Sequence, residues 1–189
     1  MPELMNFVIS GKRIYIKILQ KNDITNEYIE GLNDPEVNRY LVHVKNKVQN
    51  RKLVEEFVDR NIKDPHSCLF GIFHKNKNNK LIGTVRIHEI SPIHFCARIG
   101  ICLFKKEFWG QGIGSEAISM VSNLAFDRFG LHYLEAGIYI ENKASIKAFT
   151  TSGFHHSYKV KNKYRLEEQF SDVVFLYIIN TKFDLALLK

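Results

Sequence analysis

The chain has 189 residues, of which 45% are hydrophobic and 25% are charged, and its formal net charge at pH 7 is +7. This composition is that of an ordinary folded protein and excludes a disordered chain, and the absence of any long apolar run excludes a membrane-spanning protein. We therefore expect one domain over residues 1–189 and no membrane partner.

The first half of the chain is predicted to form a strand, two helices and then three further strands. Alternating apolar and charged residues are typical of a half-buried strand, whereas apolar residues at helical spacing predict a helix. Two of the later strand-like runs are joined by a short polar segment, which indicates a hairpin. In chain order, these elements are expected at residues 13–19, 22–31, 50–62, 68–75, 80–90 and 96–104.

The second half alternates helices and strands and ends in two strands. In chain order, a helix, a strand, a short helix and two strands are expected at residues 113–130, 132–140, 142–153, 154–164 and 170–179. The whole order is βααβββαβαββ. Hairpins followed by two βα units indicate an α/β domain built on a mixed sheet.

Cysteines, histidines and the N-terminal segment predict no metal, no disulfide and no export. Cys68, Cys96 and Cys102 form an odd set without Cys-x-x-Cys spacing, and we interpret them as buried thiols. The eight histidines lack metal-ligand spacing, so no metal is expected. The segment MPELMNFVISGKR lacks the features of a secretory signal, which predicts a cytoplasmic protein.

Three glycines, Gly110, Gly112 and Gly114, lie at the junction of a predicted strand and a predicted helix. Glycine clusters suit positive φ angles or close approach to a backbone. The first turn of a helix offers free N–H groups and a positive dipole end, so this loop predicts a pyrophosphate cradle. It is not a P-loop, because no lysine follows Gly114, and a Rossmann fingerprint would need glycine where Ser115 stands. A glycine turn without a ligand is the remaining alternative.

Residues 97–154 closely resemble the core of the GNAT superfamily of acetyl-CoA-dependent N-acetyltransferases, and LNDPEVNRYL resembles its ribosomal-protein and amino-sugar branches. The matching residues are Gly112, Ile113, Gly114, Asn142, Ser145, Ile146, Gly153 and Phe154. The resemblance implies a mixed, mostly antiparallel twisted sheet flanked by helices. It also implies an acyltransferase that uses acetyl-CoA in a direct ternary mechanism, without a metal.

By the same resemblance, acetyl-CoA binds between the strand at 99–104, which splays from its neighbour, and the glycine loop. A backbone N–H near Cys102 or Leu103 would hold the developing oxyanion. Small residues on the face of Gly100 and Cys102 would leave room for the pantetheine arm. The implied cofactor-binding residues are Ile101, Cys102, Leu103, Trp109, Gly110, Gln111, Gly112, Ile113, Gly114, Ser115, Asn142, Ser145 and Lys147.

The chain departs from the family pattern at two positions. Trp109 stands where the loop usually begins with Arg or Gln, so phosphate binding would rest more on backbone N–H groups. Phe149 stands where a tyrosine often protonates the departing thiolate, which leaves the general acid unassigned.

Transfer to an amine requires a base, and the candidates are His88, Glu89 and His94 on the strands beside the acetyl group. A histidine has a pKa of about 6.5, near the operating pH, whereas a carboxylate would need an upward shift or a water relay. A water chain that removes the proton is the alternative.

The predicted acceptor is a small molecule with a primary amine, and a nucleotide-linked amino sugar is the first choice. Its pyrophosphate would pair with Arg86, Arg98 or the basic run at 159–165. An N-terminal protein acetyltransferase, or a non-catalytic module that binds CoA or a polyanion, are the alternatives. The basic runs lack a nucleic-acid motif, so no specific nucleic acid is expected, and a homodimer is left open.

Overall fold

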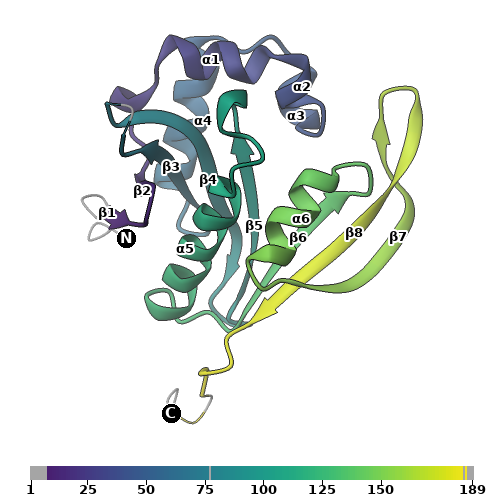
Figure 1. Ribbon diagram of the computed structural model, residues 1–189. Helices are drawn as coiled ribbons and strands as arrows, with labels where there is room; N and C mark the ends of the chain where they lie inside the picture. Colours follow the sequence, from purple (N-terminus) through teal and green to yellow (C-terminus); the bar gives the residue numbers. More distant parts are fainter. Residues whose placement is uncertain (1–7, 77, 185, 187–189) are drawn as a thin grey trace.

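A twisted sheet forms the middle of the molecule and carries helices on both faces (Figure 1). This computed structural model describes residues 8–76, 78–184 and 186. The strands are β1 (Val8–Ser10), β2 (Ile14–Ile18), β3 (Cys68–His74), β4 (Lys80–Ser91), β5 (Cys96–Leu103), β6 (Tyr133–Tyr139), β7 (His155–Leu166) and β8 (Gln169–Ile179). The helices are α1 (Asn26–Asn33), α2 (Pro35–Asn38), α3 (Val42–Lys45), α4 (Arg51–Lys63), α5 (Ile113–Asp127) and α6 (Lys143–Thr151), with 3-10 turns η2 (Lys21–Asp23) and η3 (Lys106–Phe108).

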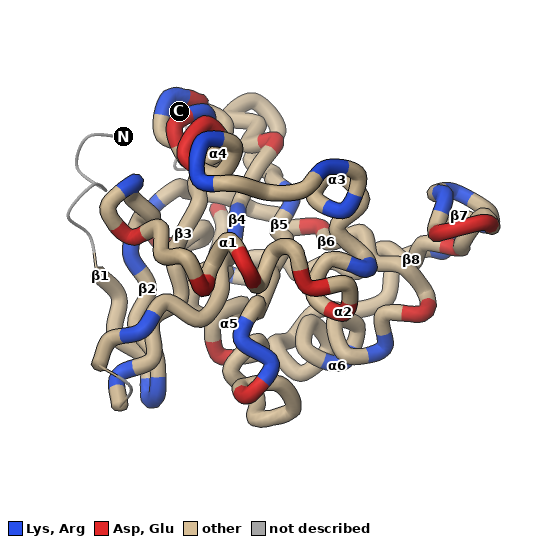
Figure 2. The backbone as a smooth tube through the Cα atoms, turned by 90° about the horizontal axis from the view of Figure 1, so that it is seen from above, with Lys and Arg blue, Asp and Glu red and all other residues tan. Residues whose placement is uncertain are grey.

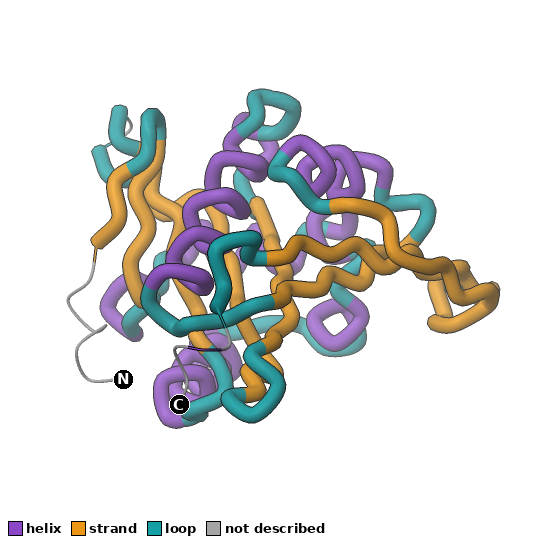
Figure 3. Tube along the Cα trace, turned by 90° about the horizontal axis from the view of Figure 1, so that it is seen from below, coloured by secondary structure: helices purple, strands orange, loops and turns teal. Residues whose placement is uncertain are grey.

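The eight strands lie in the order β1-β2-β3-β4-β5-β6-β8-β7. All neighbours are antiparallel except β5 and β6, which are parallel. This confirms the predicted mixed, mostly antiparallel sheet flanked by helices. The long β7–β8 hairpin extends away from the other elements as an arm (Figures 1 and 3).

Two apolar clusters, one on each face of the sheet, hold the helices in place. Phe70 and Ile72 of β3 belong to the cluster that contains α5, whereas Leu69 and Phe73 belong to the cluster that contains α1 and α4. Successive side chains on a strand point to opposite faces, so both faces of β3 are buried. This explains why β3 is a continuous apolar run rather than an alternating one.

The feature that creates a site is the separation of β5 from β6. Their parallel pairing covers only Cys96 to Arg98 on β5 and Tyr133 to Glu135 on β6. Beyond that point β5 continues alongside β4, while β6 stays paired with β8 up to Tyr139. The two central strands therefore diverge, and the facing edge of β5 has no strand partner over its last residues.

The structure also corrects and extends the predicted elements. The first long helix begins after Thr25, whose side chain accepts a hydrogen bond from the Tyr28 N–H at 3.2 Å, and not at residue 22. Asp23 cannot cap it because its carboxylate binds the Gln20 N–H at 2.9 Å and Lys17 at 2.6 Å. Strand β1 and the four-residue helices α2 and α3 are additional elements that the predicted order lacks.

Candidate active site

A cavity of 560 Å³ lies where β5 and β6 diverge. Strand β5 contributes Gly100, Ile101 and Cys102 to its wall, and β6 contributes Ile138 and Tyr139. A Cβ atom built on Gly100 would meet no atom within 4 Å, so this position is open space. The cavity continues to residues of α1, α3, α4 and α6, and its volume lies in the range of ligand-binding pockets.

One face of β4 completes the wall. Thr84, Arg86 and His88 are two residues apart, so their side chains share a face, and all three line the cavity. In the sheet, Thr84 pairs with Cys102 and Arg86 pairs with Gly100. Polar groups on β4 are thereby placed directly beside the open edge of β5. Of these three, Thr84 was not a predicted site residue, although its spacing from His88 is the signal that points to it.

The glycine loop has the geometry of an anion cradle. Gly110 and Gly112 have φ angles of +71° and +75°, which glycine adopts readily and other residues rarely do. The first intrahelical bond of α5 joins the Glu116 N–H to the Gly112 carbonyl at 3.1 Å. In the described part of the chain, the N–H groups of Ile113, Gly114 and Ser115 have no acceptor, so they are available to a phosphate.

Arg13, which comes just before β2, holds the glycine loop and the first turn of α5 in place. Its backbone N–H and its Nε each donate to the Glu116 carboxylate at 2.9 Å, and its guanidinium also donates to the Gln111 carbonyl. Burial opposes ionisation of Glu116, but the hydrogen bonds from Arg13 outweigh it and hold the pKa of Glu116 below its usual value. Arg13 thus neutralises the one carboxylate in the first turn of α5, which would otherwise repel a phosphate.

Trp109 ties the loop to β5 instead of presenting a charge to a ligand. Its indole Nε1–H donates to the Leu103 carbonyl at 2.8 Å, while the residue as a whole is 41% exposed. The residue that replaces the usual Arg or Gln therefore sets the distance between the cradle and the open edge of β5. The backbone N–H groups are therefore the donors that the loop would offer to a phosphate.

Replacing Trp109 with phenylalanine is expected to weaken acetyl-CoA binding about threefold to tenfold, because one hydrogen bond contributes about 0.5–1.5 kcal/mol. The phenylalanine ring keeps most of the packing and removes only the donor to Leu103. Calorimetric titration of both proteins with acetyl-CoA measures the change. Equal dissociation constants would show that this bond does not position the cradle.

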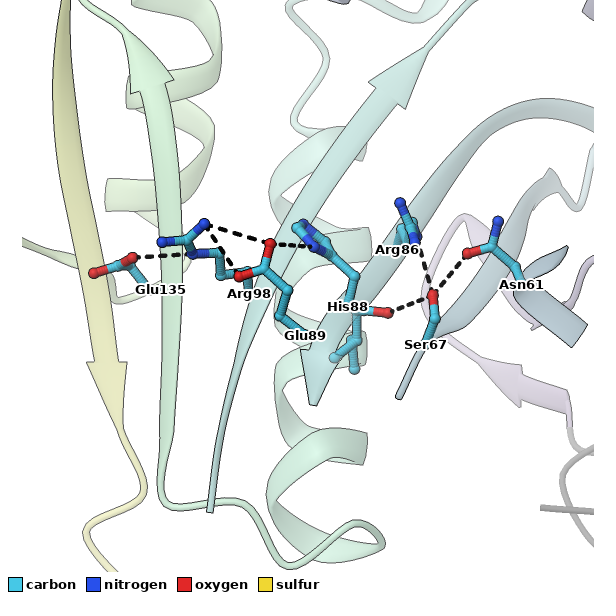
Figure 4. A network of polar contacts seen from close by, with 8 residues as sticks. Asn61, Ser67, Arg86, His88, Glu89, Arg98 and Glu135 are labelled. Carbon is cyan, nitrogen blue, oxygen red and sulfur yellow. Dashed lines mark hydrogen bonds and ion pairs between the residues drawn. The ribbon is translucent and has the colours of Figure 1, made fainter. Parts of the chain in front are cut away.

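The three base candidates are not equivalent in the structure. His88 is half-buried and lines the cavity, and its Nδ1 lies 3.5 Å from the Glu89 carboxylate. Glu89 has a φ of +53° in the irregular end of β4 and also pairs with Arg98 at 3.1 Å (Figure 4). His94 is exposed in the turn between β4 and β5 and does not line the cavity. Burial, and then the charge of Arg86, lower the pKa of His88, so its imidazole is neutral at pH 7.

Of the cofactor-binding residues predicted at and on α6, some line the cavity and one does not. Asn142 and Ser145 line the cavity, and the Asn142 side chain accepts a hydrogen bond from the Ser145 N–H at 3.1 Å, which makes it the N-cap of α6. Lys147 is exposed and lies outside the cavity wall. Phe149 is buried and packs edge to face on Phe154, with 5.0 Å between ring centroids. The cavity wall therefore has no hydroxyl where the family tyrosine stands.

Cys102, the cysteine of the cavity wall, has the properties of a protonated thiol. Burial raises the pKa of the Cys102 thiol to about 12, so it stays protonated at neutral pH. Within the described residues, no group of three or more His, Cys, Asp or Glu side chains is arranged to hold a metal ion. No helix in that part of the chain is long and apolar enough to cross a membrane.

Comparison with known proteins agrees with this geometry. The family model described as acetyltransferase (GNAT) domain matches residues 13–155. The probable N-acetyltransferase YjcK of Bacillus subtilis is 29% identical over 183 residues, which cover 92% of this chain and 97% of that protein.

Two solved structures have the same fold. Spermidine N-acetyltransferase from Vibrio cholerae, solved with CoA and spermine, has a TM-score of 0.80 at 20% identity and covers 92% of this chain and 99% of its own. Ribosomal-protein-S5-alanine acetyltransferase from Vibrio fischeri has a TM-score of 0.77 at 18% identity, and the match covers 95% of this chain and 100% of that protein. With the family model matching most of its length, this chain belongs to the GNAT family of acetyltransferases, as residues 97–154 had indicated.

Proposed function

We propose that this acetyltransferase moves the acetyl group of acetyl-CoA to the primary amine of a small acceptor, by direct attack within a ternary complex. The observation that carries the proposal is one continuous cavity, which joins the diverging edges of β5 and β6 to the inner surfaces of α3 and α4. Acetyl-CoA would lie along the open edge of β5 with its pyrophosphate at the start of α5. The acceptor would enter from the side of the helices.

In this proposal the chain supplies position, a base and backbone donors. The amine nitrogen forms a bond to the thioester carbon, the carbon–sulfur bond breaks, and the amine proton passes to the neutral imidazole of His88. A backbone N–H on the unpaired edge of β5, near Cys102 or Leu103, would stabilise the charge that develops on the carbonyl oxygen. The thiolate takes its proton from water, because Phe149 has no hydroxyl to supply one.

The acceptor is less constrained than the donor. The two structural relatives act, by their names, on spermidine and on an alanine of ribosomal protein S5. A nucleotide-linked amino sugar remains our first choice for this chain, because its pyrophosphate would complement Lys47, Arg60 and Arg86 of the cavity wall. A protein N-terminus is the second choice.

An acceptor panel tests this proposal. Thiol release from acetyl-CoA is measured with amino sugars of nucleoside diphosphates, aminoglycosides, polyamines and N-terminal peptides, with acetyl-CoA held constant. Turnover with at least one small amine is expected. Turnover confined to peptides would overturn the small acceptor and leave the acetyltransferase activity intact.

A further inference from the structure

Arg86 is a half-buried arginine of the cavity wall that has no ion-pair partner among the described residues. Its Nε donates to the Ser67 hydroxyl at 3.0 Å, and that hydroxyl donates to the Asn61 side-chain oxygen at 2.6 Å. Asn61 in turn donates to the Phe57 carbonyl at 2.8 Å, and the guanidinium lies 5.6 Å from the Phe57 ring centroid. Every one of these partners is neutral, so Arg86 is held in place without a carboxylate in contact with it among the described residues.

Placing the positive charge of Arg86 in this half-buried position costs folding free energy, which a bound anion would offset. Burial is the largest influence on the pKa of Arg86 and lowers it, the charges of Asp64 and Glu89 raise it, and the charge of Arg60 lowers it, so that the net direction is down. A cation partly removed from water without an opposite charge in contact costs folding free energy, and such perturbed groups cluster at functional sites. Figure 4 shows Ser67 on one side of the guanidinium and the outermost nitrogen pointing away from it.

The cavity wall as a whole carries more positive than negative side chains. The wall contains Lys47, Arg60 and Arg86 against a single carboxylate, Glu56. Viewed from above, α3 and the start of α4 carry Lys and Arg, and acidic residues of α4 lie next to the latter (Figure 2). A polyamine, which carries only positive charge, would therefore be repelled by the wall that it has to touch.

Arg98 and Lys159, which the sequence also suggested as anion ligands, are different. Arg98 pairs with Glu89 at 3.1 Å and with Glu135 at 3.3 Å, and Lys159 pairs with Asp172 at 3.1 Å. Their charges are already balanced by carboxylates. Of these three cations, Arg86 alone lines the cavity and lacks a carboxylate partner in the described part of the chain.

We propose that the acceptor carries a carboxylate or phosphate group besides its amine, and that the Arg86 guanidinium binds this anionic group. The planar guanidinium suits two-point recognition of either anion. Arg86 and His88 lie two residues apart on one strand, about 6.6 Å along it, so an acceptor anchored at Arg86 extends its amine toward His88. This inference rests on the proposed function, since it names the acceptor class of the same site.

Matched pairs of acceptors test the inference: ethanolamine phosphate against ethanolamine, glucosamine 6-phosphate against glucosamine, and 4-aminobutyrate against its amide, with spermidine alongside. The anionic member of at least one pair is expected to have a kcat/KM at least about tenfold higher. Arg86→Gln should remove that preference through KM, and Arg86→Lys should restore part of it. A preference in the phosphate pairs would show that the acceptor's anionic group is a phosphate, and a preference in the 4-aminobutyrate pair would show that it is a carboxylate. Spermidine or a neutral amine as the best acceptor, or a preference that survives in Arg86→Gln, would overturn the inference.

A binding measurement tests Arg86 without relying on turnover. Pyrophosphate is titrated calorimetrically into protein saturated with CoA, so that the cradle at α5 is already filled. Wild-type protein should bind it at least about tenfold more tightly than Arg86→Gln, and Arg51→Gln, which removes an arginine of α4 outside the cavity wall, should match the wild type. Equal binding by wild type and Arg86→Gln, or no binding by the wild type, would contradict the inference. Failure to bind CoA would instead count against the proposed function.

Discussion

Replacing Gly112 with valine is expected to lower the affinity for acetyl-CoA about 10- to 100-fold in a protein that still folds. Gly112 has a φ of +75°, where a β-branched residue is strained by about 1–3 kcal/mol, so the loop would shift to relieve the strain. The free N–H groups at the start of α5 would then no longer converge on a phosphate. Each hydrogen bond to a charged group is worth about 1.5–3 kcal/mol, so losing one accounts for the predicted range.

Gly130→Val is the matched control for this experiment. Gly130 also has a positive φ, of +62°, and a Cβ there would meet nothing within 4 Å, but it lies beyond the other end of α5. The control should lose a similar amount of stability in urea and keep its affinity for acetyl-CoA. If Gly112→Val binds acetyl-CoA as tightly as the wild type, the cradle is not where the pyrophosphate binds.

Replacing His88 with glutamine is expected to lower kcat by about 100-fold, because a positioned general base contributes about 10²- to 10⁴-fold. The dissociation constant for acetyl-CoA should not change, since His88 lies on β4 and not in the glycine loop. His94→Gln, which changes an exposed histidine outside the cavity wall, should keep most of its activity. If both variants lost kcat to a similar extent, His88 could not be assigned as the base in preference to His94.

The pH dependence of the wild type follows from the same residue. The groups around His88 are Arg86, Glu89 and Arg98, and the net effect of burial and these charges is a lowered pKa. The neutral imidazole is the active form, so His88 should contribute an acidic limb in which kcat/KM falls as the pH drops through its lowered pKa. His88→Gln should lose this acidic limb. An unchanged limb in the variant would assign it to another group.

Local patterns were sufficient for the longer elements of the fold. The apolar stripe that begins at Ile113 predicted α5, and the paired apolar runs predicted the β3–β4 hairpin, because burial leaves a period in the sequence. Four-residue helices such as α2 and α3 are too short to show a period. Asp23 has the right chemistry for a cap, but its contact with Lys17 decides that it closes a turn instead.

The candidate site depended on contacts that local patterns cannot show. The glycine loop was visible because positive φ angles leave glycines in the sequence, and the divergence of β5 from β6 was expected only through the family resemblance. The Arg13–Glu116 contact joins residues that are 103 positions apart, so nothing local indicates it. The contrast between Arg86 and Arg98 likewise depends on which carboxylates the sheet brings near each one.

Initial rates of thiol release, measured while acetyl-CoA and an accepted small amine are both varied, test the central claim most directly. Direct attack within a ternary complex predicts amine-dependent release and double-reciprocal lines that intersect, because both substrates must be bound before the thiol leaves. Parallel lines would indicate a covalent acetyl-enzyme and contradict the mechanism. No release with any amine, by a protein that still binds CoA, would contradict the claim of catalysis itself.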